Sequence, residues 1–260
     1  MHILLTNDDG LLAPGLLAAY AGLKARGHRV TACAPDSQRS ASSHSVTLDR
    51  PVKAAPWTMP DGALGFAVYG TPADCVRLGL TALAREPVDL VVSGLNDDTN
   101  LGFDINYSGT VAAALEAAAA GYPALAASFE RAAVMDWDLA VQVLAAVVDS
   151  LKTWQLAPGL AVNLNIPARL TAGREDWFWT RTKPEANADY YEGAPHPDGS
   201  VLYRRRRPLE PDVPDLGREP DNDVEHALLG HITLSPILPH SCPEAVLARL
   251  AAAGRGLQGA

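Results

Sequence analysis

Two adjacent carboxylates follow the first apolar run of the chain, in Asn7-Asp8-Asp9-Gly10. In a tight turn their negative charges repel each other unless something compensates, and a hard divalent cation does so directly. Gly10 lets the backbone turn away sharply. The competing interpretation is an ordinary Asp-rich turn, in which one carboxylate caps the next helix and the other is exposed. The pair alone leaves both interpretations open.

A hydroxyl-rich segment, residues 37–45, follows the second apolar run. Hydroxyls and successive backbone N–H groups suit phosphate oxygens, and one hydroxyl can ligate a metal. The hydroxyls of interest belong to Ser40, Ser42 and Ser43. His44 could hydrogen-bond a phosphate or act as a general acid. An exposed Ser-rich loop with a solvated His would have the same composition.

A third polar segment begins after the apolar run at residues 88–93. Asn96 offers a neutral amide oxygen to a cation that already faces two carboxylates. Ser108-Gly109-Thr110 then precedes an Ala-rich helix, whose free N–H groups and positive dipole end bind phosphate well. Ser108 or Thr110 could instead be only the N-cap, and the two interpretations are compatible. Glu116, further inside this helix, is expected to be structural.

The elements that position these residues alternate between strand and helix. Predicted strands span residues 2–6, 29–34, 46–53, 67–69, 88–93, 124–128 and 160–165, and predicted helices span 14–26, 71–85, 109–120 and 136–154. Apolar strands alternating with helices predict an α/β fold, a doubly wound, mostly parallel Rossmann-like sheet. Ligands of such sheets bind at the carboxyl ends of the strands, so the three polar segments should meet at one edge.

The pattern changes after about residue 168. Residues 177–182 and 201–205 predict the two arms of an antiparallel ribbon, and the Arg run at 204–207 is interpreted as a solvated strand edge. An extended stretch, a short helix at 224–229, a strand at 232–234 and a helix-prone tail at 245–250 follow. We therefore expect a catalytic core over residues 1–168 that carries the metal site. Residues 169–260 should complete the core.

Composition narrows the function classes. The 260 residues carry a formal charge of −9, which argues against nucleic acid or an anionic membrane as the main partner. The three cysteines form no C-x-x-C pair, which fits a reducing compartment without a disulfide framework. The N-terminal apolar run is too short for a signal peptide, and no stretch has the length of a membrane span. We expect a soluble cytoplasmic protein.

Several motifs then match a known family in order. They are ILLTNDDG, APDSQRSASSHSVTL, YGTPADCV, VVSGLNDDTNLGFDINYSGTVAAALEAAAAGYPALAAS, AVNLNIP and DNDVEHALLGHITLSPI. Together they resemble the SurE family of stationary-phase survival nucleotidases across nearly the whole chain. The resemblance implies a 5′/3′-nucleotidase that hydrolyses nucleoside monophosphates. It also implies a cytoplasmic homodimer or homotetramer whose C-terminal segments are exchanged between subunits.

The resemblance further implies one divalent cation per subunit, Mg²⁺ or Mn²⁺. The implied metal ligands are Asp8, Asp9, Ser40 and Asn96, of which the two aspartates are also the catalytic candidates. The candidate phosphate or substrate contacts are Asn7, Ser42, Ser43, His44, Asn100, Ser108, Gly109 and Thr110. Asp8 or Asp9 would orient or deprotonate an attacking water, and an aspartyl-phosphate path stays open beside it.

The chain departs from the family pattern at two positions. Ala41 stands where the family usually has Gly after the ligand serine, and Asp98 stands where Gly is common after the ligand asparagine. Asp tolerates a positive φ better than most residues.

Three rival functions are disfavoured. A haloacid-dehalogenase-type phosphatase separates its two acids by one residue, a P-loop enzyme needs G-x-x-x-x-G-K-[ST], and a phosphate-binding protein without turnover would not need the full ligand set.

Overall fold

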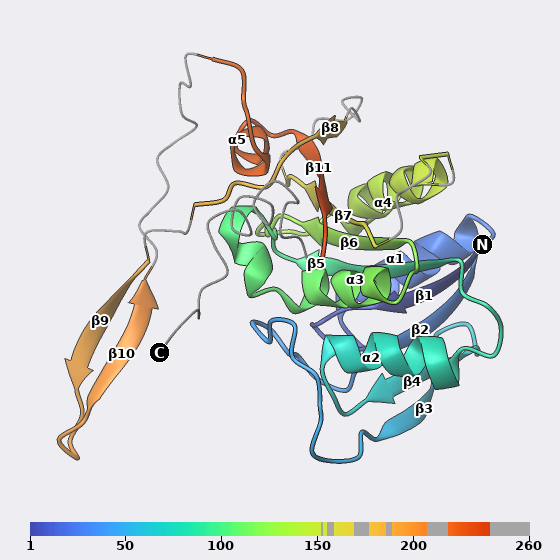
Figure 1. Cartoon of the computed structure of the whole chain (residues 1–260), viewed down its shortest axis with the longest axis horizontal. Coiled ribbons are helices and arrows are strands. Elements are labelled where there is room, and N and C mark those ends of the chain that lie inside the picture. The colour runs from blue at the N-terminus through green and yellow to red at the C-terminus, as the bar shows by residue number, and fades with distance from the viewer. Residues whose placement is uncertain (152, 155–158, 169–176, 186–188, 207–217, 240–260) are drawn as a thin grey trace, which may run out of the picture.

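The computed structural model describes residues 1–151, 153–154, 159–168, 177–185, 189–206 and 218–239. Within these residues nine strands form one sheet in the order β3-β4-β2-β1-β5-β6-β7-β11-β8 (Figure 1). The strands are β1 (His2–Thr6), β2 (Arg29–Pro35), β3 (Ala54–Thr58), β4 (Leu64–Val68), β5 (Leu90–Asp97), β6 (Ala124–Phe129), β7 (Ala161–Ile166), β8 (Trp177–Trp179) and β11 (Ile232–Ile237).

Helices cover both faces of this sheet (Figure 1). They are α1 (Pro14–Ala25), α2 (Pro72–Leu78), α3 (Gly109–Ala119), α4 (Trp137–Leu151) and α5 (Asp223–Leu228), with short turns η1 (Gly79–Leu83) and η2 (Gly102–Asn106). Alternate residues of β1 serve the two faces: Ile3 and Leu5 belong to one buried cluster with α1 and α4, and Leu4 belongs to the other with α2 and α3.

The central pairings are parallel, from β4 through β2, β1, β5 and β6 to β7. β3 and β11 run antiparallel to their partners β4 and β7. The sequence-based prediction of a doubly wound, mostly parallel sheet is therefore confirmed. No helix among the described residues is long and apolar enough to cross a membrane.

One predicted strand was wrong, and the start of another was misplaced. Residues 46–53 form no strand, and the edge strand is β3, eight residues further on. Pro51 cannot donate to a ladder, whereas Pro56 is tolerated in β3 because that strand lies at the edge of the sheet. β3 and β4 form a hairpin, and β4, the strand predicted at residues 67–69, begins at Leu64.

The C-terminal ribbon also differs from the prediction. Its arms are β9 (Tyr190–Pro195) and β10 (Val201–Arg206), and the predicted first arm is instead β8 in the main sheet. β8 pairs in parallel with β11, a partner more than fifty residues away that local sequence does not reveal. The predicted helix over 71–85 ends as α2 at Leu78 and continues as the wider turn η1. The predicted tail helix at 245–250 lies outside the described residues.

Candidate functional site

The three polar segments meet at the carboxyl edge of the sheet. The Thr110 hydroxyl at the start of α3 donates a hydrogen bond to Asp8 Oδ1, just beyond β1. The backbone N–H of Arg39, in the segment after β2, donates to the Asp8 carbonyl at 2.6 Å. The backbone N–H of Asp97, at the end of β5, donates to Asp9 Oδ2 at 3.4 Å. Four elements therefore converge on the two aspartates, as the strand-end rule requires.

Gly109 lies in direct contact with this centre. A Cβ built there would stand 2.7 Å from Asp8 Cβ and 2.9 Å from both Asp8 Oδ2 and Ser42 Oγ. Only a residue without a side chain allows the first turn of α3 to approach Asp8 so closely. The free N–H groups at the start of α3 therefore lie beside a carboxylate and a hydroxyl at one point.

The Ser42 hydroxyl has no hydrogen-bond partner among the described residues although its oxygen is buried. Arg39 Nε, in the same segment, is buried and unpartnered in the same way. Buried polar atoms in native proteins almost always have a hydrogen-bond partner, so these two unpartnered atoms indicate a bound ligand or an ordered water. Both groups suit a phosphate oxygen, one as a hydroxyl donor and the other as a charged N–H donor.

Burial raises the pKa of Asp8 above its usual value, and the negative charge of Asp9 adds to this while the Thr110 hydrogen bond opposes it. The pKa of Asp9 is also raised, mainly by burial. The donors to these carboxylates are neutral: a hydroxyl, an amide and a backbone N–H. Two neighbouring acids in such surroundings are suited to a bound cation.

Gln38 joins two of the expected metal ligands. Its Nε2 donates to Asp9 Oδ1 at 3.3 Å and to Ser40 Oγ at 2.9 Å. One amide nitrogen therefore lies between two oxygens that a cation would share. Asn96 donates its own amide N–H to the Asp98 carbonyl at 2.6 Å, which leaves its side-chain oxygen as an acceptor for a cation.

Two carboxylates, a hydroxyl and an amide form an all-oxygen donor set, which suits Mg²⁺ or Mn²⁺ better than a soft metal. Among the described residues no cluster of three or more His, Cys, Asp or Glu side chains forms another metal centre. The residues present therefore fit the cation that the sequence predicted.

Four candidate contacts have their side chains engaged elsewhere. Asn7 closes the turn after β1, with its amide paired to the Gly10 carbonyl at 3.0 Å and N–H at 3.1 Å. Ser108 caps α3 by accepting from the Val111 N–H at 3.1 Å. In the structure these two side chains shape the turn after β1 and the start of α3.

Asn100 is the third such residue. Its side-chain amide donates to Ser128 Oγ at 2.8 Å. Its backbone carbonyl accepts hydrogen bonds from the side-chain amides of Asn163 and Asn165 at 2.8 and 3.1 Å. This buried network ties the segment after β5 to β6 and β7. The fourth, His44, pairs through Nε2 with Glu116 Oε2 at 2.8 Å.

Asp223 was not among the sequence candidates, yet it supports the site from the far end of the chain. Its carboxylate accepts from the backbone N–H groups of Gly102, Lys183 and Val224, each at 2.9 Å. Burial raises its pKa, and these hydrogen bonds oppose the rise. Gln38 and Arg39 were also missed. Both lie within residues 37–45, the segment that was predicted to bind phosphate. Their side-chain N–H donors could have identified them as candidates.

Both departures from the family pattern occupy unusual backbone conformations. Ala41 has φ +55° and Asp98 has φ +152°, values at which glycine is favoured. The Asp98 carboxylate accepts from the adjacent Thr99 N–H at 2.8 Å and is exposed. It therefore turns back on its own loop.

Comparison with known proteins matches this arrangement. The family model "Survival protein SurE" matches residues 3–189. A protein of Maridesulfovibrio salexigens named 5′-nucleotidase SurE is 39% identical, with 91% of this chain and 92% of the relative covered. One of the same name from Solidesulfovibrio magneticus is 38% identical over 97% of each chain.

A solved structure shares the fold as well. The crystal structure of the SurE protein from Aquifex aeolicus superimposes with a TM-score of 0.81 at 29% identity, covering 97% of this chain and 99% of that one. Sequence and fold thus agree with these relatives along nearly the full length, and the chain belongs to the SurE family.

Proposed function

We propose that this protein is a 5′-nucleotidase, a metal-dependent phosphomonoesterase that hydrolyses nucleoside 5′- and 3′-monophosphates to nucleoside and phosphate. Its relatives at 38–39% identity carry the name 5′-nucleotidase. The observation that carries the proposal is the contact between Asp8, the unpartnered Ser42 hydroxyl and the first turn of α3 at Gly109. These groups form an anion-binding site beside the buried Asp8 and the half-buried Asp9.

One divalent cation, Mg²⁺ or Mn²⁺, would be held by Asp8, Asp9, Ser40 and Asn96. When bound, it supplies charge that polarises a phosphoryl oxygen and acidifies a water molecule. The protein itself fixes the ligands. The Thr110 hydroxyl orients the Asp8 carboxylate, and the Asp97 N–H orients that of Asp9.

The phosphate would be bound by neutral and positive donors around Gly109. The first turn of α3, with its free backbone N–H groups, and the unpartnered Ser42 hydroxyl meet beside Gly109. Arg39 Nε is a further buried and unpartnered donor in the same segment as Ser42. Ser43 contributes through its backbone, which donates to the Tyr107 carbonyl at 3.0 Å and fixes the segment against η2.

Asp8 or Asp9 would accept the proton of the attacking water. Burial raises the pKa of both carboxyls above the usual value, which favours proton uptake by either of them. Attack by Asp8 itself, giving an aspartyl-phosphate, is the alternative path. A substrate made chiral at phosphorus with oxygen isotopes separates the two, because direct attack by water inverts the configuration at phosphorus whereas the two displacements of the aspartyl path retain it.

We also propose a cytoplasmic homodimer or homotetramer, in which residues 169–260 serve assembly and residues 1–168 carry the site. Tyr190, Tyr191 and Tyr203 on the ribbon of β9 and β10 are at least half exposed, which is typical of a surface that another subunit covers. Cys33 and Cys75 are free and buried, in keeping with a reducing compartment. Light scattering of the purified protein measures the assembly.

The function is tested by phosphate release from a panel of nucleoside 5′- and 3′-monophosphates with Mn²⁺ or Mg²⁺. Release should stop with EDTA, return with added metal, and be lost in Asp9→Ala. Asp61→Asn is the matched control, because Asp61 pairs with Lys24 and Tyr20 away from the site. Folded protein that releases no phosphate from any monophosphate with either metal would refute the proposal.

A further inference from the structure

Glu116 is a buried carboxylate that joins two elements besides its own helix. It lies in α3 and is 8% exposed. Its Oε2 pairs with His44 Nε2 at 2.8 Å, in the segment after β2, and its Oε1 accepts from Arg77 Nε at 2.5 Å, in α2. The Arg77 guanidinium compensates the buried charge, so the second oxygen is available to His44.

The segment of residues 37–45, which contains His44, is under backbone strain. Ala41 and Ser43 both have positive φ, +55° and +51°, although neither is glycine. Such conformations persist only when the surrounding structure holds them. Besides the Ser43 N–H bond to the Tyr107 carbonyl, the pair between His44 and Glu116 is the side-chain anchor nearest to the strained residues.

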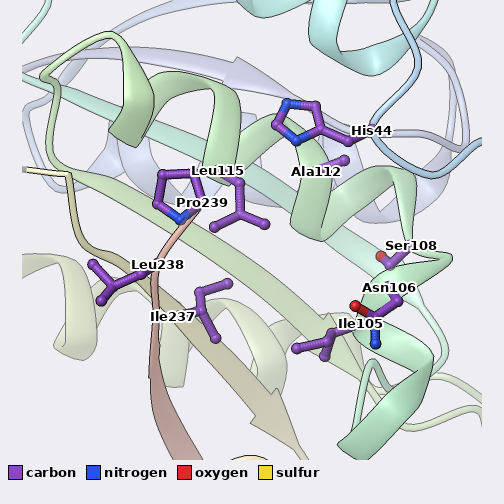
Figure 2. A pocket seen from close by; sticks show the side chains of 9 residues that line it. All are labelled: His44, Ile105, Asn106, Ser108, Ala112, Leu115, Ile237, Leu238 and Pro239. Atoms are coloured by element: carbon purple, nitrogen blue, oxygen red, sulfur yellow. The ribbon is translucent and has the colours of Figure 1, made fainter. Parts of the chain in front are cut away.

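Packing alone does not hold the His44 ring. The ring borders a pocket of about 350 Å³ lined by residues of η2, α3 and the end of β11. Figure 2 shows His44 and Ser108 on one side of this pocket, with Leu238 and Pro239 opposite. Because one side of the ring faces open space, its hydrogen bond to Glu116 is the restraint that fixes its position.

We propose that Glu116 is a positioning residue, which acts through His44 to hold residues 37–45 in the strained conformation that presents the Ser42 hydroxyl beside Asp8 and Gly109. The inference rests on the proposed function, because it assigns the phosphate to that hydroxyl. In this role the imidazole of His44 is a hydrogen-bond donor to Glu116 and transfers no proton to the substrate.

Kinetics of four variants test this role. His44→Ala and Glu116→Ala should each lower kcat/KM by about 10- to 100-fold, as expected for removing a supporting hydrogen bond around a ligand loop. The double variant should be no worse than the more impaired single variant, because both break the same contact. His44→Gln keeps an N–H donor near the position of Nε2, and its kcat/KM should stay within about 3-fold of the parent.

A second measurement does not depend on activity. Arg39 lies inside the segment, so trypsin cleavage after Arg39, followed by mass spectrometry, reports its local opening. Cleavage should be faster in His44→Ala and Glu116→Ala but unchanged in His44→Gln. Glu116→Gln, nearly isosteric, serves if Glu116→Ala fails to fold, and Asp61→Asn is the matched carboxylate-to-amide control.

The outcomes separate this inference from the function itself. If His44→Gln is as inactive as His44→Ala, the imidazole takes part in the chemistry and the positioning role is wrong. Additive losses in the double variant, or unchanged cleavage after Arg39 in both Ala variants, would overturn it as well. A parent protein without nucleotidase activity would refute the proposed function, whereas the cleavage pattern would still test the anchor.

Discussion

Replacing Gly109 by Ala tests the geometry of the site most directly. The added Cβ would stand 2.7 Å from Asp8 Cβ and 2.9 Å from Asp8 Oδ2 and Ser42 Oγ. None of these atoms belongs to a long flexible side chain that could move aside. The helix start, Asp8 or the Ser42 segment must therefore shift to make room.

The size of this shift sets the expected loss. Carbon atoms in ordinary contact stand about 3.5 Å or more apart, so Gly109→Ala requires a displacement of about 0.8 Å. Misplacing reacting groups by about 1 Å costs about 100-fold in rate. We therefore expect kcat/KM to fall by about 50- to 100-fold, which corresponds to about 2.5 kcal/mol of transition-state stabilisation.

The assay is phosphate release from a nucleoside 5′-monophosphate at saturating metal, with thermal unfolding measured in parallel. Gly27→Ala is the matched control: φ at Gly27 is +81° and nothing lies within 4 Å of its Cβ position. That variant should lose about 1 kcal/mol of stability through backbone strain but keep its kcat/KM. If Gly109→Ala stays within about 3-fold of the parent, the contact between Asp8 and the start of α3 is not the reaction centre.

Three further predictions concern the surroundings of the site. Ala41→Gly should raise stability by about 1 kcal/mol, a rise in Tm of about 2–4 °C, because φ +55° strains alanine, and a lower Tm would contradict this. Gln38→Ala should lower the Mn²⁺ concentration for half-maximal activity by about 2- to 10-fold, because it removes an amide hydrogen bond to Asp9 that a cation must displace. If the variant needs more Mn²⁺ than the parent, Gln38 instead helps to hold the cation. Burial and His231 lower the pKa of His226 from 6.5, so its folded form binds fewer protons, and the stability present above about pH 6.5 should be lost as the pH falls. Tm scanned between about pH 7.5 and about pH 5 should decline less in His226→Gln, and an identical decline would place the effect elsewhere.

The site was predictable where it follows from sheet geometry. Asp8 and Thr110 are about a hundred residues apart, yet strand-end convergence brought them together in the prediction, and the structure places them in hydrogen-bond contact. The roles of Asn7 and Asn100 were not predictable. The Asn7 amide pairs with backbone groups of a turn, and the Asn100 amide donates to the Ser128 hydroxyl in β6. A sequence does not distinguish an amide that binds a ligand from one that stabilises a loop.

The C-terminal part was less predictable because its pairings are not local. The aromatic stretch at Trp177 has strand character in any context, but whether it joins β10 or β11 depends on the path of a long intervening chain. The support that Asp223 gives, and the partners of Glu116, were not predictable for the same reason. A buried acid is informative only once its partners are known, and theirs come from other elements.

The position of β11 in the sheet has a consequence during synthesis on the ribosome. β7 is bordered on one side by β6 and on the other by β11, and about 70 residues separate β7 from β11 in sequence. At translation rates of about 5–20 residues per second, β7 keeps one unpaired edge for about 4–14 s after it emerges. Its apolar sequence AVNLNI is open to pairing with another nascent chain during that interval. Slow codons or pauses between these strands would lengthen this exposure, so the yield of soluble protein should depend on synthesis speed in this part of the message.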